Sequence, residues 1–194
     1  MSNEWQQRYE TQDTPWEKGV PHPGLVDFLR RQPIHGRVLV PGCGTGHDVR
    51  AVAATADEVV GLDIAPAAIA AAKAHPEIGG ERYVVGDLFA LPASMRGAFD
   101  CVVEHTCFCA IPLERRADYA HAVAGALEPG GHLLAIFFLN PDMDPGESGP
   151  PFGVSTSELD NLFGPAFELL GEWPPTATYP GREGRELCRL YRRK

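Results

Sequence analysis

Four chemically reactive side chains lie within one short segment, residues 104–111, which reads EHTCFCAI. Glu104 and His105 are followed by Cys107 and Cys109, and the segment comes directly after the apolar run FDCVV. Three kinds of site fit these residue types: a metal site, a cysteine nucleophile with a histidine base, or the wall of a pocket for a bound cofactor. We expect no metal here, because C-x-C supplies two ligands, a structural zinc needs four, and the chain has no CxxC pair or spaced histidine motif to complete the set.

A glycine-rich loop forms a second candidate site. Gly42, Gly44 and Gly46 follow the apolar residues VLVP and precede a helix, so the backbone there can approach a ligand closely. Asp63 ends the next predicted strand, where a carboxylate can accept hydrogen bonds from both hydroxyls of a ribose, and Asp87 follows the third strand, within reach of the base. A tight turn also needs glycine for steric reasons alone, but the combination with the two acids favours a nucleoside site.

The spacing of these glycines excludes two common nucleotide motifs. The loop lacks the GK[ST] of a phosphate-binding Walker loop, and it does not match the dinucleotide fingerprint GxGxxG, since a single residue separates the second and third glycines. A nucleoside without a pyrophosphate group fits the loop better.

The elements that position these residues alternate between strands and helices. Strands are predicted at RVLVP, EVVGLD, ERYVVGD, FDCVVEH and GGHLLAIFFL, and helices at PHPGLVDFLRR, after the glycine loop, at IAPAAIAAAKAH and at PLERRADYAHAVAGAL. This order predicts an α/β fold with a doubly wound parallel sheet. Beyond a long Pro/Gly/Asp loop, a short helix (TSELDNLFG) and two strands (FELLGEW and RELCRLYRR) predict an antiparallel hairpin at the sheet edge.

Length and composition limit the remaining possibilities. The 194 residues are expected to form one domain, 1–194, that acts as a monomer. The net charge of −9 argues against a nucleic-acid partner, and no apolar run is long enough for a membrane helix. The polar amino terminus lacks the features of a secretory signal, so we expect a cytoplasmic protein whose five cysteines are reduced.

The motifs GCGTG, GLD and GDLF resemble those of class I S-adenosylmethionine-dependent methyltransferases. More specifically, WQQRYETQDTPWEKGVPHPGL, VLVPGCGTGHDV, VVGLDIA, EHTCFCAI and GPPFGVS resemble the thiopurine S-methyltransferase superfamily and its thiol and halide methyltransferase branch. The resemblance implies a Rossmann-like, seven-stranded mixed sheet with an antiparallel last strand. It also implies that an N-terminal helical lid, residues 1–35, covers the cofactor.

The resemblance further implies which residues bind S-adenosylmethionine. These are three lid aromatics, the three loop glycines, the two strand-end acids with the residues after them, and the acid of EHTCFCAI: Trp5, Tyr9, Trp16, Gly42, Gly44, Gly46, Asp63, Ile64, Asp87, Leu88 and Glu104. For the aromatics, the alternative is that they anchor a terminal helix on the core.

Methyl transfer from a sulfonium is a direct displacement, so no cysteine nucleophile is needed. Cys107 and Phe108 are expected to line the acceptor pocket, while Cys109 fits either that wall or the core. His105 is the candidate catalytic residue: it can accept a thiol proton, attract an anion when protonated, or hydrogen-bond the cofactor. The loop at residues 140–155 is expected to cap the pocket.

The predicted function is methyl transfer to a small sulfur nucleophile such as sulfide, methanethiol or another thiol. Halides or thiocyanate come next as acceptors, and thiopurines or metalloid oxyanions remain open. Two other classes are retained as alternatives: a catalytically silent partner subunit that binds S-adenosylmethionine, and an oxidoreductase that uses the second-strand acid for a dinucleotide.

Overall fold

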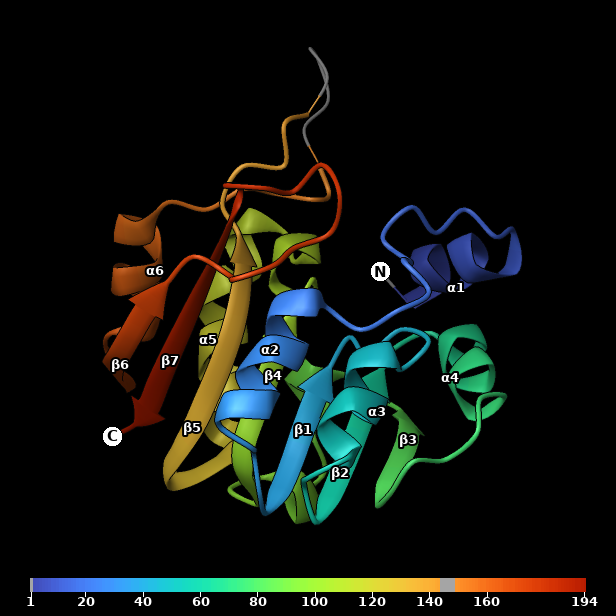
Figure 1. Cartoon of the computed structure of the whole chain (residues 1–194), viewed down its shortest axis with the longest axis horizontal. Helices are drawn as coiled ribbons and strands as arrows, with labels where there is room; N and C mark the ends of the chain where they lie inside the picture. The colour runs from blue at the N-terminus through green and yellow to red at the C-terminus, as the bar shows by residue number, and fades with distance from the viewer. Residues whose placement is uncertain (1, 144–148) are drawn as a thin grey trace.

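The computed structural model describes residues 2–143 and 149–194 and is built on a seven-stranded sheet in the order β3-β2-β1-β4-β5-β7-β6 (Figure 1). The strands are β1 (Arg37–Pro41), β2 (Glu58–Asp63), β3 (Glu81–Val85), β4 (Phe99–His105), β5 (Leu127–Phe138), β6 (Phe167–Trp173) and β7 (Glu186–Arg193). The first five strands are parallel, whereas β7 runs antiparallel to both β5 and β6. The predicted α/β fold, with a doubly wound mixed sheet and a late antiparallel hairpin, is confirmed.

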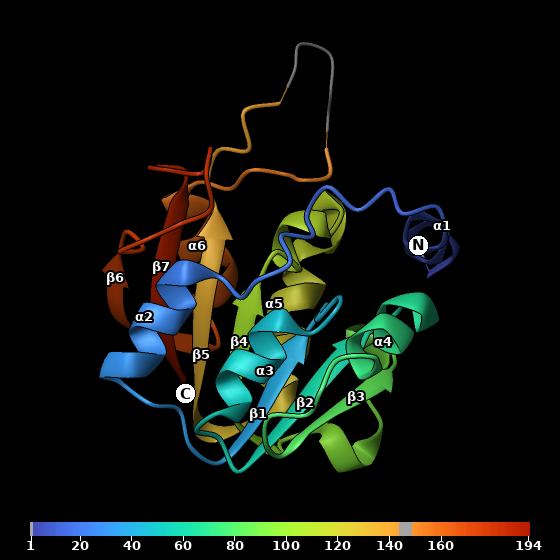
Figure 2. The ribbon, with the colours of Figure 1, turned by 45° about the vertical axis from the view of Figure 1, so that its right-hand side comes forward.

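Helices cover both faces of the sheet. They are α1 (Ser2–Glu10), α2 (Pro23–Arg31), α3 (His47–Ala53), α4 (Pro66–Lys73), α5 (Arg116–Ala126) and α6 (Thr156–Phe163), with 3₁₀ turns η1 (Leu88–Ala90), η2 (Ala93–Met95), η3 (Phe108–Ala110) and η4 (Leu113–Arg115). Figures 1 and 2 show α2 and α3 on one face and α5 and α6 on the other. Helix α6 begins at the N-cap residue Ser155, whose hydroxyl accepts the Glu158 N–H at 3.1 Å.

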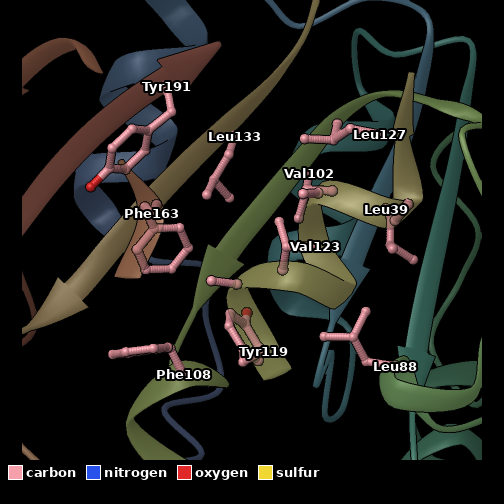
Figure 3. Packing of buried hydrophobic residues seen from close by; sticks show 14 of the residues in the cluster. Leu39, Leu88, Val102, Phe108, Tyr119, Val123, Leu127, Leu133, Phe163 and Tyr191 are labelled. Atoms are coloured by element: carbon pink, nitrogen blue, oxygen red, sulfur yellow. The ribbon is translucent and has the colours of Figure 1, made fainter. Parts of the chain in front are cut away.

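The central strands are apolar on both sides because both faces are covered. Along β4, Val102 packs into the cluster beneath α5 and α6 (Figure 3), whereas Val103 packs into the cluster beneath α2 and α3. In β5, Leu133 packs into the first of these clusters and Leu134 into the second. All four side chains are at most 2% exposed, and each contributes roughly 1.5–3 kcal/mol by leaving water. This two-sided core fixes the strand ends from which the site is built.

The N-terminal segment lies over the carboxyl ends of the strands rather than against a face of the sheet. Helix α1 lies beside α4 (Figures 1 and 2), where the Ala67 N–H donates to the Gln6 side-chain oxygen at 2.8 Å. The ring of Trp16 packs edge-on against Tyr9, and its Nε1–H donates to the Tyr9 hydroxyl at 3.1 Å. The guanidinium of Arg8 lies 4.5 Å from the centre of the Trp16 ring. Aromatic and cation–π packing therefore holds the segment around Trp16 to α1.

Among the described residues, no helix has the length and apolar character needed to cross a membrane.

Candidate functional site

A cavity of about 330 Å³ opens at the carboxyl ends of the strands, a size that suits a small-molecule site. Its walls come from the lid segment (Trp5 to Val20), the glycine loop, the ends of β2, β3 and β4, and the loops that precede α6 and β7. The three aromatics predicted for the lid, Trp5, Tyr9 and Trp16, are among its lining residues. Pro150 and Pro151 of the 140–155 loop also line it, whereas residues 144–148 lie outside the described part of the chain.

The glycine loop is shaped by backbone conformation and by close contacts. Gly42 and Gly44 have φ angles of +58° and +53°, in the left-handed region that favours glycine. A Cβ atom on Gly42 would lie 2.7 Å from the Cys107 sulfur, and one on Gly44 would lie 2.9 Å from the Tyr9 hydroxyl. The loop is therefore pressed between the lid and the turn after β4. Gly46 is placed differently, since it lies outside the lining, caps α3 and packs against Tyr83.

Two strand-end acids line the cavity, as expected for a nucleoside site. Asp63, at the end of β2, accepts the N–H groups of Gly44 and Ala65, each at 2.9 Å. Burial raises the pKa of the Asp63 carboxyl, and these N–H groups partly offset the rise. Asp87 accepts the Phe89 N–H at 2.9 Å, and Ile64 and Leu88 complete this end of the cavity. A preorganised carboxylate beside glycine backbone fits the ribose of S-adenosylmethionine.

Glu104 organises the turn after β4. It is 1% exposed, and its carboxylate accepts the N–H groups of Cys107 and Phe108 at 3.1 and 2.7 Å as well as the Tyr119 hydroxyl. Between these residues Thr106 has a φ of +62°, which is unfavourable for a β-branched side chain. The Glu104 hydrogen bonds hold this strained turn, which presents Thr106 and Cys107 to the cavity.

Two predicted site residues thus lie in the core and outside the cavity lining. We predicted Glu104 as a cofactor contact and Phe108 as part of the acceptor wall. The Glu104 carboxylate instead points inward to the backbone and Tyr119, and the Phe108 ring packs against Tyr119, Phe137 and Phe163 beneath the sheet (Figure 3). The side chains of Phe108 and Cys107 both pack in or against the same core cluster, but only Cys107 also lines the cavity.

The two cysteines of EHTCFCAI both line the cavity, Cys107 as predicted and Cys109 in addition. Burial raises the pKa of the Cys109 thiol to about 12, and it raises that of Cys107 well above its usual range. Both are therefore neutral thiols at physiological pH. They supply a soft apolar wall rather than a nucleophile.

His105 ends β4 and lines the cavity while being 9% exposed. Its Nδ1 lies 2.7 Å from the Oδ2 of Asp48, in the first turn of α3. Its Nε2 is buried and has no hydrogen-bond partner among the described residues. A buried ring nitrogen without a partner in a cavity wall is a ready site for a proton or a ligand.

His22, His105 and Glu186 place one potential metal-ligand atom each within 4.8 Å of one another. However, His22 Nδ1 accepts the N–H groups of Gly24 and Leu25, at 3.1 and 3.3 Å. Its Nε2 therefore carries the proton and donates to Glu186 at 2.9 Å. Because that nitrogen has no free lone pair, the hydrogen bonding argues against a metal ion at this cluster.

Three residues that line the cavity are not evident from the sequence: Asp48, Tyr179 and Arg182. Asp48 lies in the first turn of α3, where no local pattern reveals that it faces β4. Tyr179 and Arg182 lie in the long loop between β6 and β7, and only the antiparallel placement of β7 beside β5 brings them to the cavity. The single available signal was the polar, turn-rich composition of PPTATYPGREG.

Comparison with known proteins places this geometry in a family. Residues 1–172 match the family model for thiopurine S-methyltransferase. The chain is 31% identical to probable thiol methyltransferase 2 of Arabidopsis thaliana, over 92% of this chain and 87% of that protein. It is 32% identical to thiocyanate methyltransferase 1 of the same plant, over 94% of this chain and 81% of that protein.

Among solved structures, the chain is similar in fold to one described as the conversion of a disulfide bond into a thioacetal group during echinomycin biosynthesis. That similarity has a TM-score of 0.82 at 23% identity and covers all of this chain and 92% of the other. Together with the sequence matches, the sheet order and the cavity identify the chain as a member of the thiopurine S-methyltransferase family, a S-adenosylmethionine-dependent methyltransferase.

Proposed function

We propose that the methyl acceptor is a small thiol, such as hydrogen sulfide or methanethiol, and that His105 removes its proton. The observation that carries the proposal is the buried Nε2 of His105, which is unpartnered among the described residues and belongs to a residue of the cavity wall. A free thiol is a poor nucleophile until it is deprotonated, so a proton acceptor beside the acceptor site suits this substrate class.

Asp63, Asp87 and the backbone of Gly42 and Gly44 would hold the nucleoside, with the lid aromatics covering it. When bound, S-adenosylmethionine would supply an electrophilic methyl group, so that a thiol that has lost its proton to the protein would take the methyl group and leave the S-methylated product and S-adenosylhomocysteine. The chain itself supplies position and the exclusion of water. The neutral thiols of Cys107 and Cys109 add an apolar wall that favours a polarizable sulfur acceptor.

A second candidate is transfer to a small anion, thiocyanate or a halide, and Arg182 favours it. This guanidinium lines the cavity at the β7 side and stacks 4.7 Å from the centre of the Phe138 ring. Within residues 2–143 and 149–194, the Arg182 guanidinium donates one hydrogen bond, to Glu186 at 3.1 Å, and its other N–H groups can attract an anion. The relative named thiocyanate methyltransferase 1 is consistent with this acceptor class.

One set of reactions distinguishes the thiol acceptor from the anion acceptor. The purified protein is incubated with S-adenosylmethionine and, in separate vials, sulfide, methanethiol, iodide or thiocyanate, and S-adenosylhomocysteine and the headspace product are quantified. Methylated sulfur with little iodomethane supports the thiol assignment. Faster turnover of iodide or thiocyanate than of either thiol supports the anion assignment. Cofactor binding without turnover in any vial contradicts both and leaves a silent cofactor-binding subunit or a different acceptor.

A further inference from the structure

The carboxylate of Asp48 bridges two elements through its two oxygens. Its Oδ1 accepts the backbone N–H of His22 at 2.8 Å, and its Oδ2 lies 2.7 Å from Nδ1 of His105. Burial raises the pKa of the Asp48 carboxyl, but the two histidine contacts outweigh burial and lower the pKa overall. Asp48 is therefore ionised at neutral pH and can only accept hydrogen bonds.

This arrangement determines where the proton of the neutral His105 ring resides. An acceptor-only carboxylate at 2.7 Å requires the hydrogen on Nδ1, and a neutral imidazole carries a single ring proton. The lone pair is then on Nε2, the buried atom without a described partner. His22 has the opposite tautomer, because two backbone N–H groups donate to its Nδ1.

We infer that Asp48 is a positioning residue that fixes the Nδ1–H tautomer of His105, so that the site accepts a proton from the methyl acceptor and selects thiols over halides. This inference rests on the proposed function for its substrate class. In the step itself the S–H bond of the thiol breaks, its proton moves to Nε2, and the electron pair stays on sulfur. The Asp48 carboxylate stabilises the resulting His105 imidazolium, which later releases the proton to solvent. A halide has no proton to lose, so its methylation is not accelerated by this base.

The substitution Asp48→Asn reverses the tautomer without changing the size of the side chain. The amide oxygen must remain at the His22 N–H, because only the oxygen can accept that hydrogen bond. The NH₂ group then faces His105 Nδ1 and forces this nitrogen to act as the acceptor. Nε2 consequently carries the proton, and the base is lost while the ring stays in place.

The first readout is spectroscopic and needs no substrate. Two-bond ¹H–¹⁵N correlation spectra of protein with ¹⁵N-labelled histidine distinguish the tautomers at a pH where the rings are neutral, and His105→Gln assigns the signal. We expect Nδ1–H for His105 and Nε2–H for His22 in the unsubstituted protein, and Nε2–H for both in Asp48→Asn. An Nε2–H tautomer for His105 in the unsubstituted protein overturns the inference even if the variant fails to fold.

The second readout compares kcat/KM for methanethiol and for iodide. Asp48→Asn is expected to lower the thiol value by about 100-fold or more, the usual contribution of a general base, and to change the iodide value only a few-fold. Asp118→Asn is the matched control, since this carboxylate is 62% exposed on α5 and pairs with Arg115 at the surface. An equal loss for both acceptors, or no loss for the thiol, contradicts the positioning role.

The combined results separate this inference from the proposed function. If the unsubstituted protein fails to methylate any thiol but shows the expected tautomers, the acceptor class is wrong and the role of Asp48 in fixing the ring stands. If thiols are methylated and Asp48→Asn leaves both the tautomer and the rate unchanged, the acceptor class stands and the role of Asp48 is wrong.

Discussion

Replacing Gly46 with alanine tests whether the glycine loop has the conformation described. Gly46 has a φ of +78°, which L-residues other than glycine rarely adopt. A Cβ atom there would lie 2.6 Å from Cε1 of Tyr83 and 2.8 Å from its hydroxyl oxygen, closer than van der Waals contact. The ring is not free to turn away without cost, because its hydroxyl accepts a hydrogen bond from Arg50 at 3.3 Å.

Two energetic costs determine how much Gly46→Ala destabilises the fold. The left-handed conformation costs about 1–2 kcal/mol for a residue with a Cβ, and forcing a methyl against a packed ring costs about 1–3 kcal/mol. Gly46→Ala should therefore lower the free energy of unfolding by about 2–5 kcal/mol, a large share of the roughly 5–15 kcal/mol of a typical domain.

Two other glycines provide matched controls for these terms. Gly130 has a φ of +81°, but a Cβ there would have no described non-neighbouring residue within 4 Å, so Gly130→Ala should cost only the conformational term. Gly125 lies in α5, with an ordinary helical φ and open space, so Gly125→Ala should stabilise the protein by about 0.4–1 kcal/mol. Urea unfolding measures all three variants. If Gly46→Ala costs no more than Gly130→Ala, the contact with Tyr83 and the loop geometry built on it are wrong.

Three further perturbations test the buried carboxylates Glu104 and Glu186 and the lid residue Trp16. Tyr119→Phe should destabilise the fold by about 1–3 kcal/mol in urea unfolding, because buried Glu104 loses a hydrogen-bond donor; an unchanged midpoint contradicts that network. Hydrogen bonds from His22 and Thr178 outweigh burial and lower the pKa of Glu186 to about 2, and burial lowers the pKa of His22. On acidification the unfolded chain therefore takes up protons at a higher pH than the folded protein does. Urea midpoints should accordingly fall below about pH 6.5 and most steeply between about pH 4.5 and 2, whereas a flat profile refutes this assignment. Trp16→Ala should weaken S-adenosylmethionine binding in calorimetry with little change in the free energy of unfolding. An unchanged affinity would contradict the prediction that Trp16 covers the cofactor.

The sequence contained enough local information to predict the sheet and the cavity wall formed by the glycine loop and the ends of β2 and β3. Hydrophobic runs ended by Asp63 and Asp87 identify strands whose carboxyl ends meet at one edge, and the positive φ angles of Gly42 and Gly44 agree with the loop expected from their spacing. These features depend on residues close together in the chain, so pattern and turn chemistry reveal them.

The cavity wall around His105 depends on contacts between distant residues, and the sequence predicts it only in part. His105 was recognised as the titratable group, but its partner Asp48 comes from a different helix, and the direction of the Phe108 ring depends on the turn that Glu104 holds. Arg182 reaches the cavity only because β7 inserts between β5 and β6. No local periodicity specifies such pairings, since tertiary packing decides them.

The most direct test offers the protein equal concentrations of methanethiol and of iodide in parallel sealed vials with S-adenosylmethionine, because iodomethane formed beside a thiol would itself methylate that thiol. We expect more dimethyl sulfide than iodomethane, with dimethyl sulfide equal in amount to the S-adenosylhomocysteine of its vial, and a large loss of dimethyl sulfide alone in His105→Gln. The control His121→Gln, at an exposed position of α5, should match the unsubstituted protein. A predominance of iodomethane, or a dimethyl sulfide yield that does not depend on His105, would contradict the central claim that a buried histidine base directs methyl transfer to a thiol.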